Sequence, residues 1–192
     1  MAKNILIIQG HPDVERKHFC HALAAEYQSA AADAGHKVHL LTVADLDFPL
    51  ITSQQDFEHG DLPADIQQAQ QEIQWCNHLV IIYPLWLGTM PALLKGFFEQ
   101  TFRYGFALSL EDGQMPKRLL TGKSARLIVT MGMPALAYRW FFGAHGVFNL
   151  ERSILKVCGI KPVKHLFIGM VEEDARVDRW FTKIKRIARA AG

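Results

Sequence analysis

The sequence lacks the features that mark several large classes of protein. Its three cysteines, Cys20, Cys76 and Cys158, are far apart and form no C-x-x-C pair, so they indicate neither a disulfide framework nor a zinc site. It has no long basic run and a formal net charge of only +2, which argues against a nucleic-acid partner. Cysteines used so sparingly are typical of a reduced, cytoplasmic protein.

Long hydrophobic runs are missing as well. The apolar run near the N-terminus ends at Gln9 and is shorter than the apolar core of a signal peptide. The longest apolar stretch, residues 79–94, falls below the roughly 18 residues of a spanning helix and contains Pro84, Gly88 and Pro91. We therefore expect a soluble protein with no integral membrane segment. Its hydrophobic content of 49% is ample for one domain over residues 1–192.

The sequence does contain an alternation of two patterns. Short apolar runs typical of fully buried strands occupy residues 4–8, 37–43, 78–83, 124–130 and 163–168. Helices are predicted over residues 14–34, from Pro63, over residues 91–103 and 150–157, and from Glu172 onward, with a long loop over residues 46–60. This alternation predicts an α/β fold, a doubly wound five-stranded parallel sheet with helices on both faces and the common strand order 2-1-3-4-5.

Three loops of this predicted fold have unusual compositions. In a doubly wound sheet, ligands bind beyond the carboxyl ends of the strands, where the strand order reverses. The loops that follow the first, third and fourth predicted strands meet at that edge, and they are residues 9–13, 84–91 and 131–134.

The first of these loops combines a turn glycine, Gly10, with the cationic or titratable residues His11, Arg16, Lys17 and His18. Backbone N–H groups at a helix start, together with such side chains, can hold a phosphate. The alternative is a plain turn followed by a solvated helix face. Neither G-x-G-x-x-G nor a P-loop is present, so the sequence supports no dinucleotide fingerprint.

The second loop is apolar but is broken by Pro84, Gly88 and Pro91. Prolines hold the backbone in an extended or turned path, and glycine permits close approach by another group. With Trp86 beside it, such a loop suits a flat aromatic ligand that is hydrogen-bonded at its edge. The alternative is that Trp86 and its leucine neighbours belong to the core.

These segments carry a family resemblance. Residues 84–108 (PLWLGTMPALLKGFFEQTFRYGFAL) resemble the signature segment of the flavodoxin-like NAD(P)H dehydrogenase (quinone) family, which includes ancillary flavoproteins of potassium-efflux systems. Similar segments elsewhere are residues 5–12 (ILIIQGHP), 18–23 (HFCHAL), 76–82 (CNHLVII) and 153–160 (SILKVCGI). The similarity covers about residues 4–170, and residues 91–96 (PALLKG) are its most specific element.

The resemblance implies one flavodoxin-like, flavin-binding domain in a cytoplasmic homodimer. It implies a tightly bound FAD or FMN, hydride transfer from NAD(P)H through the flavin N5 to a quinone or similar acceptor, and a ping-pong mechanism. Carried over by position, the phosphate, ribityl and ring contacts fall on His11, His18, Phe19, Cys20, Pro84, Leu85, Trp86, Leu87, Thr130, Met131, Gly132 and Met133.

The resemblance also implies catalytic roles for Tyr138 and His145. Hydride arrival places negative charge on the far edge of the ring, where a phenol or imidazole donor can stabilise it. The alternative is that Tyr138 is core and His145 merely starts a helix. Residues 139–142 (RWFF) between them form either a wall for the acceptor, a dimer contact or a short buried helix.

The chain departs from the family pattern at several of these positions. His18 replaces a serine and Cys20 an asparagine, which leaves FAD versus FMN open. Trp86 stands one position earlier than the family tryptophan, and Met131 and Met133 replace a threonine and a glycine. His18 and His21 lie three residues apart but have no third ligand in the sequence, so no metal is predicted.

Two other functions remain open from the sequence. One is a flavodoxin-type electron carrier, although such carriers are usually strongly acidic and this chain has an isoelectric point near 8.4. The other is a flavin-binding regulatory subunit of a transporter.

Overall fold

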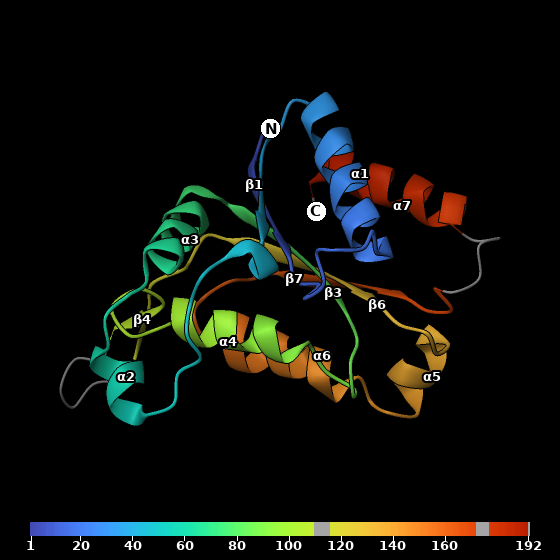
Figure 1. The fold of residues 1–192 in the computed structure, drawn as a ribbon. Helices are drawn as coiled ribbons and strands as arrows, with labels where there is room; N and C mark the ends of the chain where they lie inside the picture. The colour runs from blue at the N-terminus through green and yellow to red at the C-terminus, as the bar shows by residue number, and fades with distance from the viewer. Residues whose placement is uncertain (110–115, 172–176, 192) are drawn as a thin grey trace.

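The computed structural model describes residues 1–109, 116–171 and 177–191. Its centre is a five-stranded parallel sheet with helices on both faces (Figure 1). The strands are β1 Asn4–Gln9, β2 Lys37–Thr42, β3 His78–Pro84, β6 Ser124–Thr130 and β7 Val163–Ile168, in the order β2-β1-β3-β6-β7. Counted along the chain, this is the predicted order 2-1-3-4-5, so the predicted fold class is confirmed.

Alternate residues of the central strands face two separate cores. Leu6 and Ile8 of β1 join one core, beneath α3 Ala64–Trp75, α4 Ala92–Thr101 and the π-helical η2 Leu150–Leu155. Ile5 and Ile7 join the other, beneath α1 Phe19–Asp33 and α7 Val177–Ala190. Because helices cover both faces of the sheet, consecutive residues of β1 are apolar.

Figure 1 shows α1 and α7 together on one face of the sheet and α3, α4 and α6 on the other. The first and last described segments lie side by side, since Lys3 Nζ donates to the Ala191 carbonyl at 2.6 Å. Among the described residues, no helix has both the length and the apolar character needed to cross a bilayer.

The helix predicted over residues 14–34 is shorter than expected. It begins at Phe19, and His18 is its N-cap. Asp13 holds the preceding residues in a turn, because its carboxylate accepts from the Glu15 N–H at 2.9 Å and from the His18 ring at 2.7 Å. Arg16 and Lys17 therefore lie in the exposed loop and not on the first helical turn.

Residues 46–60 were predicted as loop throughout, and this was wrong for one part. The structure has α2 Gln54–His59 there, after the 3-10 turn η1 Val43–Asp45. The signal was Ser53, whose hydroxyl caps the helix by accepting from the Asp56 N–H at 3.0 Å. A two-stranded antiparallel pair, β4 Leu108–Ser109 and β5 Lys117–Arg118, was also not predicted.

The other predicted elements occur with small shifts. The helix predicted over residues 150–157 starts earlier, as α6 His145–Asn149, and continues into η2. A short helix, α5 Ala135–Trp140, covers part of the aromatic segment. The predicted start of the last helix at Glu172 lies outside the described residues, and the described part of that helix is α7.

Candidate active site

A cleft of about 440 Å³ lies at the carboxyl edge of the sheet, where the loops after β1, β3 and β6 meet. It is lined by His11, Asp13, His18, Pro84, Leu85, Trp86, Thr130, Met131, Gly132 and Val171. Adjacent parallel strands end at the same edge, which is why residues more than a hundred positions apart in the sequence share one cleft.

Gly10 sets the direction of the first loop. Its N–H donates to the Ile82 carbonyl at 2.8 Å, which ties the turn to β3. A Cβ at this position would lie 2.6 Å from Leu94 Cδ2, so the turn packs against α4 with no room for a side chain. This close packing places His11 at the floor of the cleft, with an exposed fraction of only 7%.

Three histidines, His11, His18 and His21, gather where this loop enters α1, and we call them the imidazole cluster. The rings of His11 and His18 stack at 3.9 Å between centroids, and that of His21 lies 5.4 Å from His11 and 5.8 Å from His18. The described residues contain no group of three ligating side chains placed to hold a metal ion. Imidazole rings can also donate hydrogen bonds to an anion.

Burial and neighbouring rings lower the pKa of two members of this cluster, His11 and His21. Burial lowers the pKa of His11 below its ordinary value, and proximity to His18 and His21 lowers it further. Burial also lowers the pKa of His21, again with a contribution from His18. The hydrogen bond from His18 lowers the pKa of Asp13, which keeps that carboxyl ionised.

Hydrogen bonds from the backbone fix which ring nitrogens carry the protons. The Asp13 N–H donates to His11 Nδ1, and the His18 N–H donates to His21 Nδ1, both at 3.1 Å. In the neutral rings Nε2 is therefore the donor. His21 Nε2 is buried and has no partner among the described residues.

Gln9, at the end of β1, supplies a second donor of this kind. Its exposed fraction is 1%, and its Oε1 accepts from the His11 N–H at 3.2 Å. Its Nε2 is buried and has no partner among the described residues. Buried donors left unpaired are costly, so these two atoms near His11 are candidates to receive an acceptor that the described residues do not supply.

The tip of the second loop forms a tight turn at the surface and is not part of the hydrophobic core. Trp86 and Thr89 exchange both backbone hydrogen bonds, at 2.9 and 3.0 Å, across the two-residue turn Leu87 and Gly88. Both turn residues have positive φ, +47° and +82°, as a type I′ turn requires. Leu87 is fully exposed at the tip. Trp86 is about half exposed, and the centroid of its ring lies 6.1 Å from that of His11.

The third loop contributes mainly backbone. The Thr130 carbonyl accepts from the Leu85 N–H at 2.7 Å, so the second and third loops are joined beside the cleft. Thr130 Oγ1 lies 3.2 Å from Cys20 Sγ. Burial raises the pKa of Cys20 to about 12, so this thiol is not ionised near neutral pH.

The two predicted catalytic residues lie beside the second loop but do not line the cleft. The buried Tyr138 hydroxyl donates to the Gly88 carbonyl at 2.9 Å. Burial raises its pKa, and hydrogen bonds with the backbone at Gly146 and Val147 partly oppose this. Tyr138 therefore ties the β3 loop to the start of α6, where His145 is exposed.

Eight of the predicted cofactor positions line the cleft, and four do not. Phe19 packs against Phe181 of α7, Cys20 is buried below Thr130, Leu87 is at the turn tip, and Met133 is partly exposed. Sequence reasoning missed two lining residues, Asp13 and Val171, and also Gln9 and His21, which lie beside His11 but do not line the cleft. Asp13 and His21 were within reach, because one stands two residues after His11 and the other one helical turn after His18.

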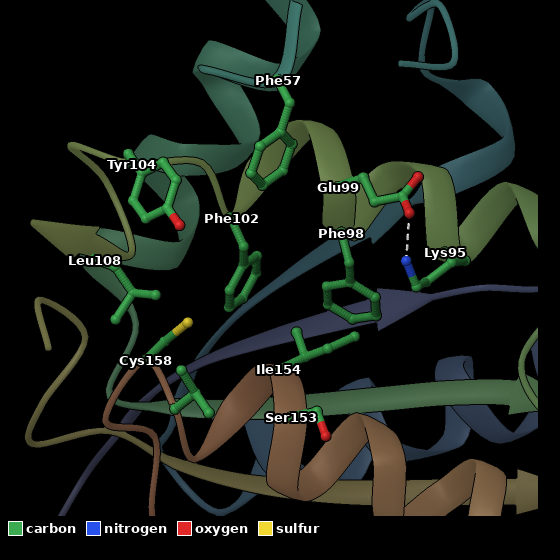
Figure 2. Close-up of a pocket in the computed structure, with 11 residues that line it drawn as sticks. Phe57, Lys95, Phe98, Glu99, Phe102, Tyr104, Leu108, Ser153, Ile154 and Cys158 are labelled. Atoms are coloured by element: carbon green, nitrogen blue, oxygen red, sulfur yellow. Dashed lines mark hydrogen bonds and ion pairs between the residues drawn. The ribbon is translucent and has the colours of Figure 1, made fainter. Parts of the chain in front are cut away.

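A second cavity, of about 190 Å³, lies on the other side of the molecule between α2, α4 and η2 (Figure 2). Its walls are mostly aromatic and aliphatic, and its one ion pair, Lys95 with Glu99, is internal to α4. Burial raises the pKa of its thiol, Cys158, to about 11. Most of its lining is apolar, and it lies away from the carboxyl edge of the sheet where doubly wound folds bind ligands, so the cleft at that edge is the better candidate.

Comparison with known proteins assigns the class. A protein family described as having a flavodoxin-like fold matches residues 3–188, and the chain belongs to that family. An uncharacterized NAD(P)H oxidoreductase of Haemophilus influenzae is 29% identical over 90% of this chain and 88% of its own. The predicted resemblance to the flavodoxin-like NAD(P)H dehydrogenases is thereby confirmed.

Solved structures agree in fold. A Streptococcus mutans protein of 29% identity superposes with a TM-score of 0.79, over 97% of this chain and 99% of that one. An NAD(P)H:quinone oxidoreductase from Methanothermobacter marburgensis, at 22% identity, superposes with a TM-score of 0.82 over the whole of both chains.

Some relatives match only in part. The chain spans 46% of the rat NAD(P)H dehydrogenase [quinone] 1, at 30% identity. It spans 49% of the potassium-efflux ancillary protein KefG of Cronobacter sakazakii, at 33% identity over 49% of this chain.

Proposed function

We propose that this protein is a flavin-dependent NAD(P)H oxidoreductase that reduces a quinone or similar acceptor by a ping-pong mechanism. The observation that carries the proposal is the cleft itself. It brings together histidines of the loop after β1, the β3 loop with Trp86, and residues 130–132 after β6.

The residues present fit a flavin nucleotide. The unpaired donors of Gln9, at the end of β1, and of His21, in the first turn of α1, lie near the ring of His11, and the start of α1 is where a phosphate would be held. Pro84, Leu85 and Trp86 line the cleft from the second loop, and Thr130 to Gly132 line it from the adjoining third loop. When bound there, a flavin supplies the capacity to accept a hydride from a nicotinamide and pass two electrons to a quinone.

The protein's own contribution is positioning and electrostatics. Tyr138 holds the Gly88 carbonyl, which fixes the β3 loop along which we place the ring. His145 is exposed at the start of α6 and is free to donate a hydrogen bond to charge developing at the ring edge. Both catalytic assignments are part of this proposal.

We also propose that the protein is a homodimer. Beside the cleft, α5 and the residues after it expose large apolar side chains, Leu136, Trp140, Phe141 and Phe142, with exposed fractions from 51% to 84%. Leu87 is exposed close to the start of α6 as well. Exposed apolar clusters of this size mark interfaces, and a second copy would also close the cleft from water.

A second candidate is a regulatory flavoprotein of a transporter. The similarity to KefG supports it, but that similarity covers only half of each chain. An electron carrier is less well supported, because the net charge of +2 offers no acidic docking face.

The decisive experiment is the absorbance spectrum of the purified protein with FMN or FAD, followed by anaerobic addition of NADH or NADPH. We expect a flavin spectrum that bleaches on addition of the nicotinamide and returns when a quinone is added. A protein that takes up neither flavin contradicts the proposal. A flavin that binds but is not reduced by either nicotinamide favours the regulatory candidate.

A further inference from the structure

The imidazole cluster contains more titratable rings than a phosphate contact requires. Three rings lie within 5.8 Å of one another, and the one carboxylate bonded to them in the described residues, Asp13, is on His18. His11 and His21 are held neutral near pH 7 by burial and by their neighbours. The site thus offers hydrogen-bond donors to a phosphate, but these rings carry no fixed positive charge to balance the negative charge of that phosphate.

The other charged groups described around the cluster do not place a positive charge against these rings. Asp45, from the η1 turn, acts on His21 from a distance and favours its protonated form. Arg16 and Lys17 are exposed in the loop before α1. On the side of the second loop, the uncharged Trp86 ring lies 6.1 Å from His11 between centroids.

We propose that Gln9, His11, His18 and His21 bind the phosphate of a flavin nucleotide with uptake of protons, so that the protein holds its cofactor more weakly as pH rises. This inference rests on the proposed function and adds Gln9 and His21 to the phosphate site. An anion within about 4–6 Å of an imidazole favours its charged form. The phosphate therefore recruits protons to the very rings that burial keeps neutral in its absence.

The sign of the effect follows from linkage. A phosphate monoester is a dianion above about pH 6, so from about pH 6.5 upward its own charge stays nearly constant. If the bound state carries one proton more than the separate components, the dissociation constant rises by about tenfold for each pH unit. The rise stops once the bound-state rings have lost their protons.

The first test compares ligands that differ only in the phosphate. Flavin fluorescence quenching gives the dissociation constants of FMN, FAD and riboflavin from about pH 6.5 to about pH 8.5. We expect binding of the phosphate-bearing flavins to weaken with pH and that of riboflavin to stay constant. Equal pH dependence for all three overturns the inference and leaves the proposed function standing. The tighter of FMN and FAD identifies whether the site takes a terminal phosphate or a diphosphate.

Matched variants assign the effect to the cluster. His21→Gln keeps a side-chain N–H donor but cannot titrate, and we expect it to reduce the pH dependence. His59→Gln alters a highly exposed histidine on α2 and serves as the control. A pH dependence that His21→Gln and His18→Asn both leave unchanged overturns the assignment.

A second measurement needs no flavin. Histidine ring resonances of the full chain are titrated by NMR with and without inorganic phosphate. We expect the ligand to raise the pKa of His11 and His21 by about one pH unit or more and to leave His59 unaffected. If no flavin binds in any condition, the proposed function fails, and this titration still decides whether the cluster is a proton-coupled phosphate site. If phosphate changes the pKa of no ring of the imidazole cluster, the inference is overturned.

Discussion

Leu87→Asn should make the folded monomer more stable although it removes a large apolar side chain. Leu87 is fully exposed, so its replacement forfeits no buried apolar surface within the monomer. Its φ of +47° lies in the left-handed region, which costs a non-glycine residue roughly 1–2 kcal/mol. Asparagine tolerates this region, and Asn-Gly is the favoured sequence of a type I′ turn. We expect a gain of about 0.5–1 kcal/mol in the free energy of unfolding.

The assay is urea unfolding of the flavin-free protein at low concentration, followed by circular dichroism. A gain of that size moves the midpoint by roughly 0.3–0.5 M at the slopes usual for small domains. Gly88→Ala is the matched control in the same turn. Its φ is +82° with nothing within 4 Å of the added Cβ, so strain alone should lower stability by about 1 kcal/mol.

The same substitution should weaken the proposed dimer. If Leu87 is covered by a second copy, losing it removes about 1.5–3 kcal/mol of burial per site, at least a tenfold change in the dimer dissociation constant by sedimentation equilibrium. The substitution should therefore stabilise the folded monomer and weaken its dimerisation. A less stable monomer would refute the reasoning about the turn, and an unchanged dimer constant would remove Leu87 from the interface.

Three further predictions concern His78, the pair Tyr138 and His145, and Gly146. Burial lowers the pKa of His78, at the start of β3, to about 3. Since the unfolded ring titrates near 6.5, stability should fall as pH drops below that value, by about 2.7 kcal/mol at about pH 4.5. His78→Gln should lose less between pH 7 and 4.5 in urea titrations, and an equal loss would contradict the assignment. Tyr138→Phe combined with His145→Ala should slow flavin reduction in stopped-flow measurements while flavin stays bound, and an unchanged rate would exclude both from the mechanism. Gly146→Ala would place a Cβ 2.2 Å from the Gly88 carbonyl, so it should shift the β3 loop and weaken flavin binding by fluorescence titration, whereas wild-type affinity would show that the loop position is unimportant.

The sheet was predictable because its signal is local. Residues 124–130 and 163–168 are strands with the predicted bounds, since a strand covered on both faces is apolar without interruption and is bounded by turn residues. The strand order followed from connection rules that do not depend on individual side chains. Helix starts were less predictable, as with α1, where Asp13 and His18 stabilise a turn that competes with helix.

The sequence by itself determined the strands, the flavodoxin-like class and the three loops that meet at the sheet edge, because periodicity and chain connectivity specify them. Only the tertiary structure decided that Trp86 begins a type I′ turn and is not core, that Tyr138 bonds to the Gly88 carbonyl, and that Gln9 and His21 leave donors unpaired beside His11. Those facts depend on which groups burial deprives of water. The burial of a single polar group depends on the packed chain, so no local pattern reveals it.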